Sequence, residues 1–236
     1  MKLINSIATK MILITSIILL CLTTIGGYFI IKESSETVQN RVDLELQSVT
    51  DRTAASIKEF LKGRSRVVTT FAANDTMKSW FKDYTERGSD LSSDETYQSI
   101  IKSFISVSEY DPIIKSVFFS SANTYEYFDI DGRYQDVNYF TNKRPWWSEA
   151  LNKDRLFITE PEVDPRDNSI VTSIKTTLRA SDNSLIGVLG IDILGSAIKK
   201  DLIDKMSYQG NGIGFLTAAN GKIIAINDSS QIDMSK

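Results

Sequence analysis

The chain has 236 residues, 42% of them hydrophobic, and a formal net charge of −3. Its length allows one large domain or two small ones, and its acidic balance argues against nucleic-acid binding, for which a basic patch is expected. The sequence has no histidine, no GxxxxGK[ST] phosphate-binding loop and a single cysteine, Cys21, so the commonest general base and the usual Cys/His metal sites are missing. We therefore expect no enzyme activity within this chain, no cofactor and no metal.

Residues 11–31 form the first predicted element, a membrane-spanning helix. This run contains no charged residue and is rich in Ile and Leu, and about 20 apolar residues at 1.5 Å each cross the hydrocarbon core of a bilayer. A cleaved signal peptide is the alternative, but its apolar region is usually only about 7–15 residues long. Lys2 and Lys10 precede the run, which favours a cytoplasmic segment 1–10 and an extracytoplasmic location for everything after the span.

Residues 33–84 are predicted to form a long stalk helix, and the polar segment 74–94 is predicted to contain a break between helices. Between Glu33 and Tyr84 there is no proline and a single glycine, Gly63, and apolar residues recur at spacings of three and four, which is typical of one helix face. This apolar stripe packs either against the chain's own domain or against a second subunit. We expect both in different parts of the helix, and therefore a homodimer.

Residues 85–195 are predicted to form a membrane-distal, PAS-like α+β module, in which the long helix packs on an antiparallel sheet. Residues 96–108 have apolar residues at helical spacing, and Pro145–Leu151 suits a short helix because proline is tolerated in the first turn. The strand candidates are rich in β-branched and aromatic residues and are bounded by Asp, Asn and Gly. They are residues 113–120, 125–130, 156–160, 170–178 and 185–194.

Residues 196–236 are predicted to form a linker helix and the start of a second, smaller PAS-like module. Segments 212–216 and 222–226 are joined through Asn220-Gly221, and Asn-Gly favours the tight turn of a β-hairpin. The sequence contains no second apolar run and no long cytoplasmic coiled coil. We therefore expect the chain to be the N-terminal piece of a larger receptor whose membrane-proximal module is incomplete here.

The stretch from Tyr139 to Trp147 is the strongest indication of a ligand site. It places Arg144 beside the indoles of Trp146 and Trp147, with the phenol of Tyr139 five residues upstream. A guanidinium binds a carboxylate through two parallel hydrogen bonds. Aromatic rings wall the apolar part of a ligand or face its cation. This stretch therefore suits the carboxylate end of a small ligand.

Two acidic residues complete the candidate site. Asp164 follows the sequence Glu-Pro-Glu-Val, and Asp192 lies in the otherwise apolar strand 185–194. A carboxylate in such a strand is costly unless it is paired, which favours a binding role for Asp192. Together with Arg144, the two carboxylates suit a zwitterion such as a free amino acid.

The order of these motifs resembles the double Cache family, the extracytoplasmic sensor domains of bacterial chemoreceptors and other transmembrane receptors. The motifs are Arg144-Pro-Trp-Trp-Ser-Glu-Ala, Ile158-Thr-Glu-Pro-Glu-Val-Asp164, Ile170-Val-Thr-Ser-Ile and Gly187-Val-Leu-Gly-Ile-Asp192. The resemblance covers roughly residues 35–236. It implies a methyl-accepting chemotaxis protein, anchored in the inner or plasma membrane, that binds an amino acid or, alternatively, an amine or another carboxylate.

The resemblance also implies a role for each side chain. Arg144 would pair with the ligand carboxylate, Trp146 would donate its indole N–H beside it, and Tyr139 would donate a hydroxyl hydrogen bond. Asp164 and Asp192 match the acidic positions that hold the α-ammonium.

Two positions depart from the family pattern. Trp147 stands where tyrosine is usual, and Glu162 replaces a tyrosine two residues before Asp164. Glu162 adds a negative charge at the ammonium end and removes an aromatic wall. That change would favour a cationic or amine ligand, or abolish binding of the usual one.

Each candidate also has a purely structural interpretation. Arg144 could form an ion pair with Asp136 or Glu149, and adjacent indoles point in different directions on a helix, so that one of them belongs to the core. Asp164 could be a turn residue. Strand aromatics are left outside the candidate site, because alternation along a strand usually reflects ordinary packing; these are Phe118, Tyr125, Tyr127 and Phe128.

Three functions remain open at this stage. The first is the ligand-sensing region of a chemoreceptor. The second is the sensor region of a transmembrane histidine kinase or cyclic-dinucleotide enzyme, which the sequence of an output domain would distinguish. The third is a Cache domain that responds to a partner protein, which the departures at Trp147 and Glu162 keep open.

Overall fold

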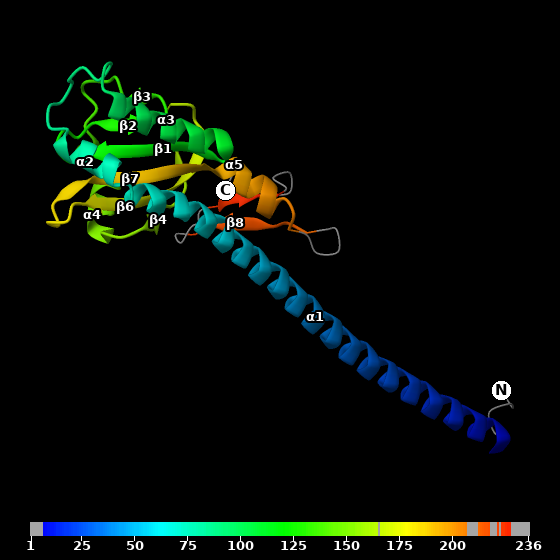
Figure 1. Ribbon diagram of the computed structural model, residues 1–236. Coiled ribbons are helices and arrows are strands. Elements are labelled where there is room, and N and C mark those ends of the chain that lie inside the picture. The colour runs from blue at the N-terminus through cyan, green and yellow to red at the C-terminus, as the bar shows by residue number, and fades with distance from the viewer. Residues whose placement is uncertain (1–6, 165, 207–211, 218–220, 222, 228–236) are drawn as a thin grey trace. The chain divides into compact units, whose positions relative to one another are not determined.

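A computed structural model describes residues 7–164, 166–206, 212–217, 221 and 223–227 (Figure 1). The chain forms two compact units, Met1–Asp51 and Arg52–Lys236. Helix α1 (Ile7–Ala72) contributes residues to both units.

The first unit consists, in its described part, of the N-terminal portion of α1. Within the described residues, α1 is the one helix that is long and apolar enough to cross a membrane. The hydroxyls of Thr15, Thr23 and Thr24 donate hydrogen bonds to backbone carbonyls one turn earlier, so these groups are satisfied without water. The predicted span 11–31 therefore lies inside one uninterrupted helix.

The stalk helix predicted over residues 33–84 is wrong at its C-terminal end. α1 ends at Ala72, and α2 (Asp75–Asp83) begins after Asn74. The backbone of Asn74 is extended and its side chain accepts a hydrogen bond from the N–H of Met77, which is the N-cap geometry that starts a new helix. α3 (Glu95–Tyr110) is capped in the same way by Asp94 and confirms the helix predicted over residues 96–108.

The second unit is built on an antiparallel sheet with the strand order β3-β2-β1-β7-β6-β4, in which β5 pairs with β6. The long strands β1, β7 and β6 form its centre and confirm the three longest predicted strands. The strands are β1 (Ile114–Ser121), β2 (Tyr127–Asp129), β3 (Gly132–Arg133), β4 (Phe157–Ile158), β5 (Glu162–Val163), β6 (Ile170–Arg179) and β7 (Leu185–Leu194).

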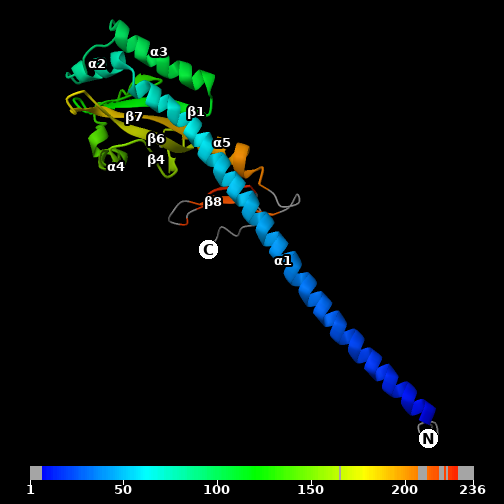
Figure 2. The same cartoon turned by 60° about the horizontal axis from the view of Figure 1, so that its bottom comes forward.

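The two faces of this sheet carry different structures. One face packs against α2, α3 and the last turns of α1 (Figures 1 and 2). Phe119 of β1 and Ile191 of β7 are fully buried there with Phe81 of α2 and Phe104 of α3. The other face carries α4 (Pro145–Lys153), the predicted short helix. Because side chains alternate along a strand, residues next to the core-facing ones point to this second face.

The C-terminal elements follow β7 directly. α5 (Gly195–Ile198) and the π-helical turn η3 (Lys199–Ile203) occupy the segment predicted as a linker helix. β8 (Phe215–Thr217) pairs with β9 (Ile223–Ile226), as the predicted hairpin requires, while Asn220 of its turn lies outside the described residues. The assignment of this hairpin to a second module stays a prediction.

Candidate ligand-binding site

The floor of the candidate site is set by the strand register. Phe118 of β1 lies opposite Gly190 of β7, which lies opposite Lys175 of β6. The neighbouring row places Asp192 of β7 between Ser116 and Ser173. These rows lie on the sheet face away from the main helices, because the residues between them, such as Ile191, belong to the helix-packed core.

Gly190 shapes this floor because it has no side chain. A Cβ at this position would lie 2.5 Å from the Cζ atom of Phe118, a distance that no packed structure tolerates. The ring of Phe118 instead lies over the glycine, stacks on Tyr127 at 5.4 Å between ring centroids and meets Trp146 edge-on at 6.0 Å. Two of the strand aromatics that sequence patterning left outside the site are therefore part of it.

The wall is formed by the segment that leads into α4. The 3₁₀ turn η2 (Thr141–Lys143) precedes Arg144, the N-cap residue of α4. The hydroxyl of Thr141 accepts a hydrogen bond of 2.6 Å from Ser120, and both its hydroxyl and its N–H bond the carbonyl of Tyr125. This fully buried threonine therefore ties the wall to the sheet.

The two adjacent tryptophans lie in different environments. Trp146 faces the cavity, whereas Trp147 is 5% exposed and packs in a separate apolar cluster with Ala150, Phe157 and Val188. Successive side chains on a helix point about 100° apart, so one indole faces the cavity and the other the core. The predicted ligand role of Trp147 has no geometric support here, in agreement with the expectation that one indole belongs to the core.

These elements enclose a cavity of about 150 Å³. It brings together six of the seven side chains that the sequence singled out, and their role in binding stays a prediction. The lining residues are Phe118, Tyr127, Tyr134, Tyr139, Arg144, Trp146, Glu162, Val163, Asp164, Arg166, Val171, Lys175 and Asp192.

Arg144 is the cation at the rim of the cavity. Its side chain is exposed, and its guanidinium carbon lies 5.4 Å from the ring centroid of Tyr139. The structural alternative, an ion pair with Asp136 or Glu149, is not found among the described residues. Burial raises the pKa of Tyr139, against the opposing effect of Arg144, so this phenol stays protonated and able to donate a hydrogen bond.

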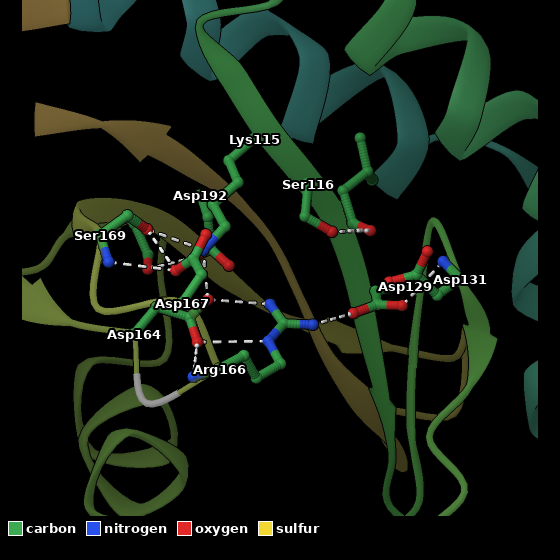
Figure 3. Close-up of polar contacts among 11 residues, drawn as sticks. Lys115, Ser116, Asp129, Asp131, Asp164, Arg166, Asp167, Ser169 and Asp192 are labelled. Carbon is green, nitrogen blue, oxygen red and sulfur yellow. Dashed lines mark hydrogen bonds and ion pairs between the residues drawn. The ribbon is translucent and has the colours of Figure 1, made fainter. Parts of the chain in front are cut away.

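Asp164 belongs to an ion-pair network along one side of the cavity (Figure 3). Arg166 Nη2 lies 3.0 Å from its carboxylate and Lys115 Nζ 2.6 Å from it, while Arg166 Nη1 lies 2.6 Å from Asp129. Burial raises the pKa of Asp164, but the hydrogen bonds from Arg166 and Lys115 outweigh it and hold the pKa well below its usual range. Asp164 is therefore ionised and already paired with two cations.

Asp192 is the contrasting carboxylate. It is 7% exposed and accepts a hydrogen bond of 2.6 Å from the hydroxyl of Ser173. No cation in the described chain lies within ion-pair distance of it. Burial raises its pKa, and the Ser173 hydrogen bond and the positive charge of Lys175 only partly offset this. A buried carboxylate without an ion-pair partner is costly, and a cation close to it would favour its ionised form.

Glu162 does not stand as an isolated negative charge. Its carboxylate lies 3.4 Å from the ammonium of Lys175, whose side chain is 2% exposed. A cation of the chain therefore already faces Glu162, and the effect of Glu162 on the choice of ligand, or on ligand binding at all, stays a prediction.

Sequence reasoning missed two cations of the cavity, Arg166 and Lys175. Lys175 is not conspicuous in the sequence, because six of the ten residues of β6 (IVTSIKTTLR) are polar, whereas Asp192 stands in the apolar strand β7. Arg166 is no more conspicuous. Its position in a loop gives no indication that it bridges Asp164 and Asp129.

Comparison with known proteins adds a family match over most of the second unit. Residues 53–200 match the family described as methyl-accepting chemotaxis protein-like, first PDC sensor domain. The chain is 24% identical over 224 residues to the methyl-accepting chemotaxis protein PctB of Pseudomonas aeruginosa, a match that covers 91% of this chain and 31% of PctB. The chain therefore spans less than a third of the length of this relative.

Solved structures of chemoreceptor domains share the fold. The ligand-binding domain of the Pseudomonas aeruginosa amino acid chemoreceptor PctC in complex with GABA has a TM-score of 0.56 at 22% identity, covering 75% of this chain and 73% of that domain. The ligand-binding domain of the Campylobacter jejuni chemoreceptor Tlp3 in complex with L-norvaline has a TM-score of 0.61 at 18% identity, covering 86% of this chain and 74% of that domain.

Proposed function

The chain belongs to the methyl-accepting chemotaxis protein-like family of sensor domains, and on this premise we propose that it is the extracytoplasmic sensor of a chemoreceptor for a small zwitterionic ligand. One observation carries the proposal. A guanidinium without an ion-pair partner in the described chain, Arg144, and a buried carboxylate without one, Asp192, line the same cavity. A free amino acid supplies both missing partners, a carboxylate and an ammonium.

The roles follow from the charges of the cavity. Arg144 pairs with the α-carboxylate, with Trp146 and Tyr139 beside it, and Asp192 receives the α-ammonium. Asp164 is already bonded to Arg166 and Lys115, so its charge is balanced within the chain and it lines this end of the cavity without a free charge. Two solved relatives contain GABA and L-norvaline, ligands that carry one carboxylate and one amino group, which supports a ligand of this kind.

The membrane arrangement is part of the proposal. α1 supplies the span, and the lysines that precede it favour an N-terminus in the cytoplasm and a sensor outside it. Val38 and Leu46 of α1 are exposed at 57% and 44%, and a second copy of the helix would cover such residues in a homodimer. Ligand binding would act by favouring one packing of α1 over another, and the signal cannot exceed the difference in ligand affinity between the two states.

Titration calorimetry of the full chain in lipid nanodiscs tests the ligand assignment. The panel contains the twenty amino acids, small amines and small carboxylates. We expect an amino acid to bind, and Arg144→Ala and Asp192→Asn each to weaken binding by about 2 kcal/mol or more, roughly 30-fold. Arg179→Ala, which removes a surface arginine paired with Asp154, is the control and leaves the affinity unchanged. Unaltered affinity in both cavity variants would refute the site.

A further inference from the structure

Lys175 is a charged side chain in a buried position. It lies in the middle of β6 and is among the largest fully buried side chains of the described chain. Its ammonium lies 5.1 Å from the ring centroid of Trp146 and 5.8 Å from that of Phe118. Two aromatic faces attract a cation but accept no full hydrogen bond from it, so the ammonium needs other acceptors.

The described chain supplies the ammonium of Lys175 with few hydrogen-bond acceptors. An ammonium has three N–H donors, and the acceptor found for Lys175 is Glu162 at 3.4 Å, longer than the ~2.7–2.9 Å of a charge-assisted hydrogen bond. Glu162 lies on the two-residue strand β5, and its side chain is 50% exposed. This pair is therefore long and open to solvent on one side.

Lys115 in the adjoining network provides an internal comparison. Its ammonium has three acceptors at short distance, Asp164 at 2.6 Å, Asp167 at 2.7 Å and Ser169 at 2.8 Å (Figure 3). Lys115 is thus saturated by the chain, although it is less buried than Lys175. The more buried of the two lysines is the one with fewer acceptors, and it lines the cavity.

We propose that Lys175 binds a second carboxylate, in the side chain of the ligand, so that the site selects acidic amino acids. This inference rests on the proposed function, in which Arg144 and Asp192 hold the α-carboxylate and the α-ammonium. The cavity then offers two cations and one anion that the chain leaves under-partnered, the charge pattern opposite to that of aspartate or glutamate. Glu162 competes with the ligand for Lys175 and swings towards solvent when the ligand binds.

A comparison of acids with their amides tests Lys175 directly. L-aspartate and L-asparagine, and L-glutamate and L-glutamine, differ in side-chain charge at nearly constant shape. In titrations of the full chain in nanodiscs we expect at least one acid to bind about 10-fold or more tightly than its amide, and L-arginine to bind more weakly than either. Equal affinities for acid and amide, or tighter binding of L-arginine, would overturn the inference.

Two variants with opposite expected effects strengthen the test. Lys175→Met keeps most of the length of the unbranched side chain and removes the charge, so it should erase the difference between acid and amide. Glu162, the partner left behind, has a side chain that is 50% exposed and can be hydrated, so this variant is expected to fold, and its melting curve checks that. Glu162→Gln removes the competitor and should tighten binding of the acid. Discrimination that survives Lys175→Met, or an acid that binds more weakly to Glu162→Gln, contradicts the inference.

The same titrations separate this inference from the proposed function. If acids and amides bind alike and Arg144→Ala abolishes both, the amino-acid site stands and the role of Lys175 falls. If succinate binds as tightly as L-aspartate, Lys175 binds the second carboxylate as inferred, and the proposed role of Asp192 towards an ammonium falls. If no amino acid and no dicarboxylate binds, both are wrong.

Discussion

Arg166 is expected to be a major source of stability in the second unit. It joins two carboxylates whose side chains are 5% and 4% exposed, Asp164 and Asp129. Breaking a buried ion pair by removing one partner costs roughly 3–5 kcal/mol. Asp164 keeps Lys115, so we expect Arg166→Met to lose about 3 kcal/mol. In a unit of this size that loss lowers the melting temperature by roughly 6–12 °C.

Arg179 supplies a matched control for this experiment. Its side chain is 33% exposed, the same fraction as that of Arg166, but its partner Asp154 is 48% exposed. Surface pairs of this kind contribute at most about 1 kcal/mol, so Arg179→Met should change the melting temperature little. The assay is thermal and urea unfolding followed by tryptophan fluorescence. Equal losses in the two arginine variants would refute the argument that partner burial decides the cost.

The pH dependence of the free energy of unfolding tests the role of Arg166 a second time. The pKa of Asp164 is lowered in the folded chain by Arg166 and Lys115, against the effect of burial. A carboxyl group with a lowered pKa stabilises the fold above its unfolded pKa of about 3.9, and that contribution is lost as the pH falls below it. The difference in stability between the wild-type chain and Arg166→Met should therefore be full at pH 7 and shrink below about pH 4. A difference that is constant from pH 7 to pH 3 contradicts this assignment.

Three further predictions concern the cavity. Gly190→Ala should cost about 1–3 kcal/mol in unfolding experiments and weaken ligand binding, because a Cβ 2.5 Å from Phe118 must displace the ring; retention of wild-type stability would show that the ring moves freely. Burial raises the pKa of Asp192, so this carboxylate becomes protonated at a higher pH than an ordinary aspartate. The affinity for an amino acid should therefore begin to fall at that higher pH on acidification, and calorimetry of Asp192→Asn should show no such pH dependence. Thr141→Val should lose about 1–3 kcal/mol of stability, since Ser120 loses its buried hydrogen-bond partner, and unchanged urea midpoints would show that this bond does not hold the wall.

Local patterns in the sequence were sufficient to predict most helices and strands and most residues of the candidate site. Three local patterns predict α1, α3 and the central strands. They are the uncharged run from Met11 to Ile31, the helical spacing of apolar residues and the segments rich in β-branched residues. Each pattern depends only on residues that are close together in the sequence. The helix expected to run to Tyr84 ends at Ala72, because the side chain of Asn74 caps a new helix. A break between helices was expected within residues 74–94, but spacing alone does not single out Asn74 as the residue that caps the new helix.

The residues of the candidate site also divide into those that local sequence identifies and those that it does not. Arg144 and Trp146 are nearly adjacent in the sequence, and Asp192 is conspicuous in an apolar strand, so these residues could be identified one at a time. The partners of the charges could not, because pairing depends on which residues the strand register and the loops bring together. Lys115 and Asp164 are 49 residues apart and Arg166 and Asp129 are 37 apart.

What the sequence determined by itself is therefore a set of local properties: an apolar span, a PAS-like pattern of helices and strands, and an inventory of side chains suited to a zwitterion. Only the tertiary structure decided which charges are already neutralised within the chain. It pairs Asp164 with Arg166 and Lys115, whereas it gives Lys175 one long contact with Glu162 and leaves Asp192 with a hydroxyl as its partner. Electrostatic energy depends on distance and burial in three dimensions, and neither quantity can be read from the order of residues.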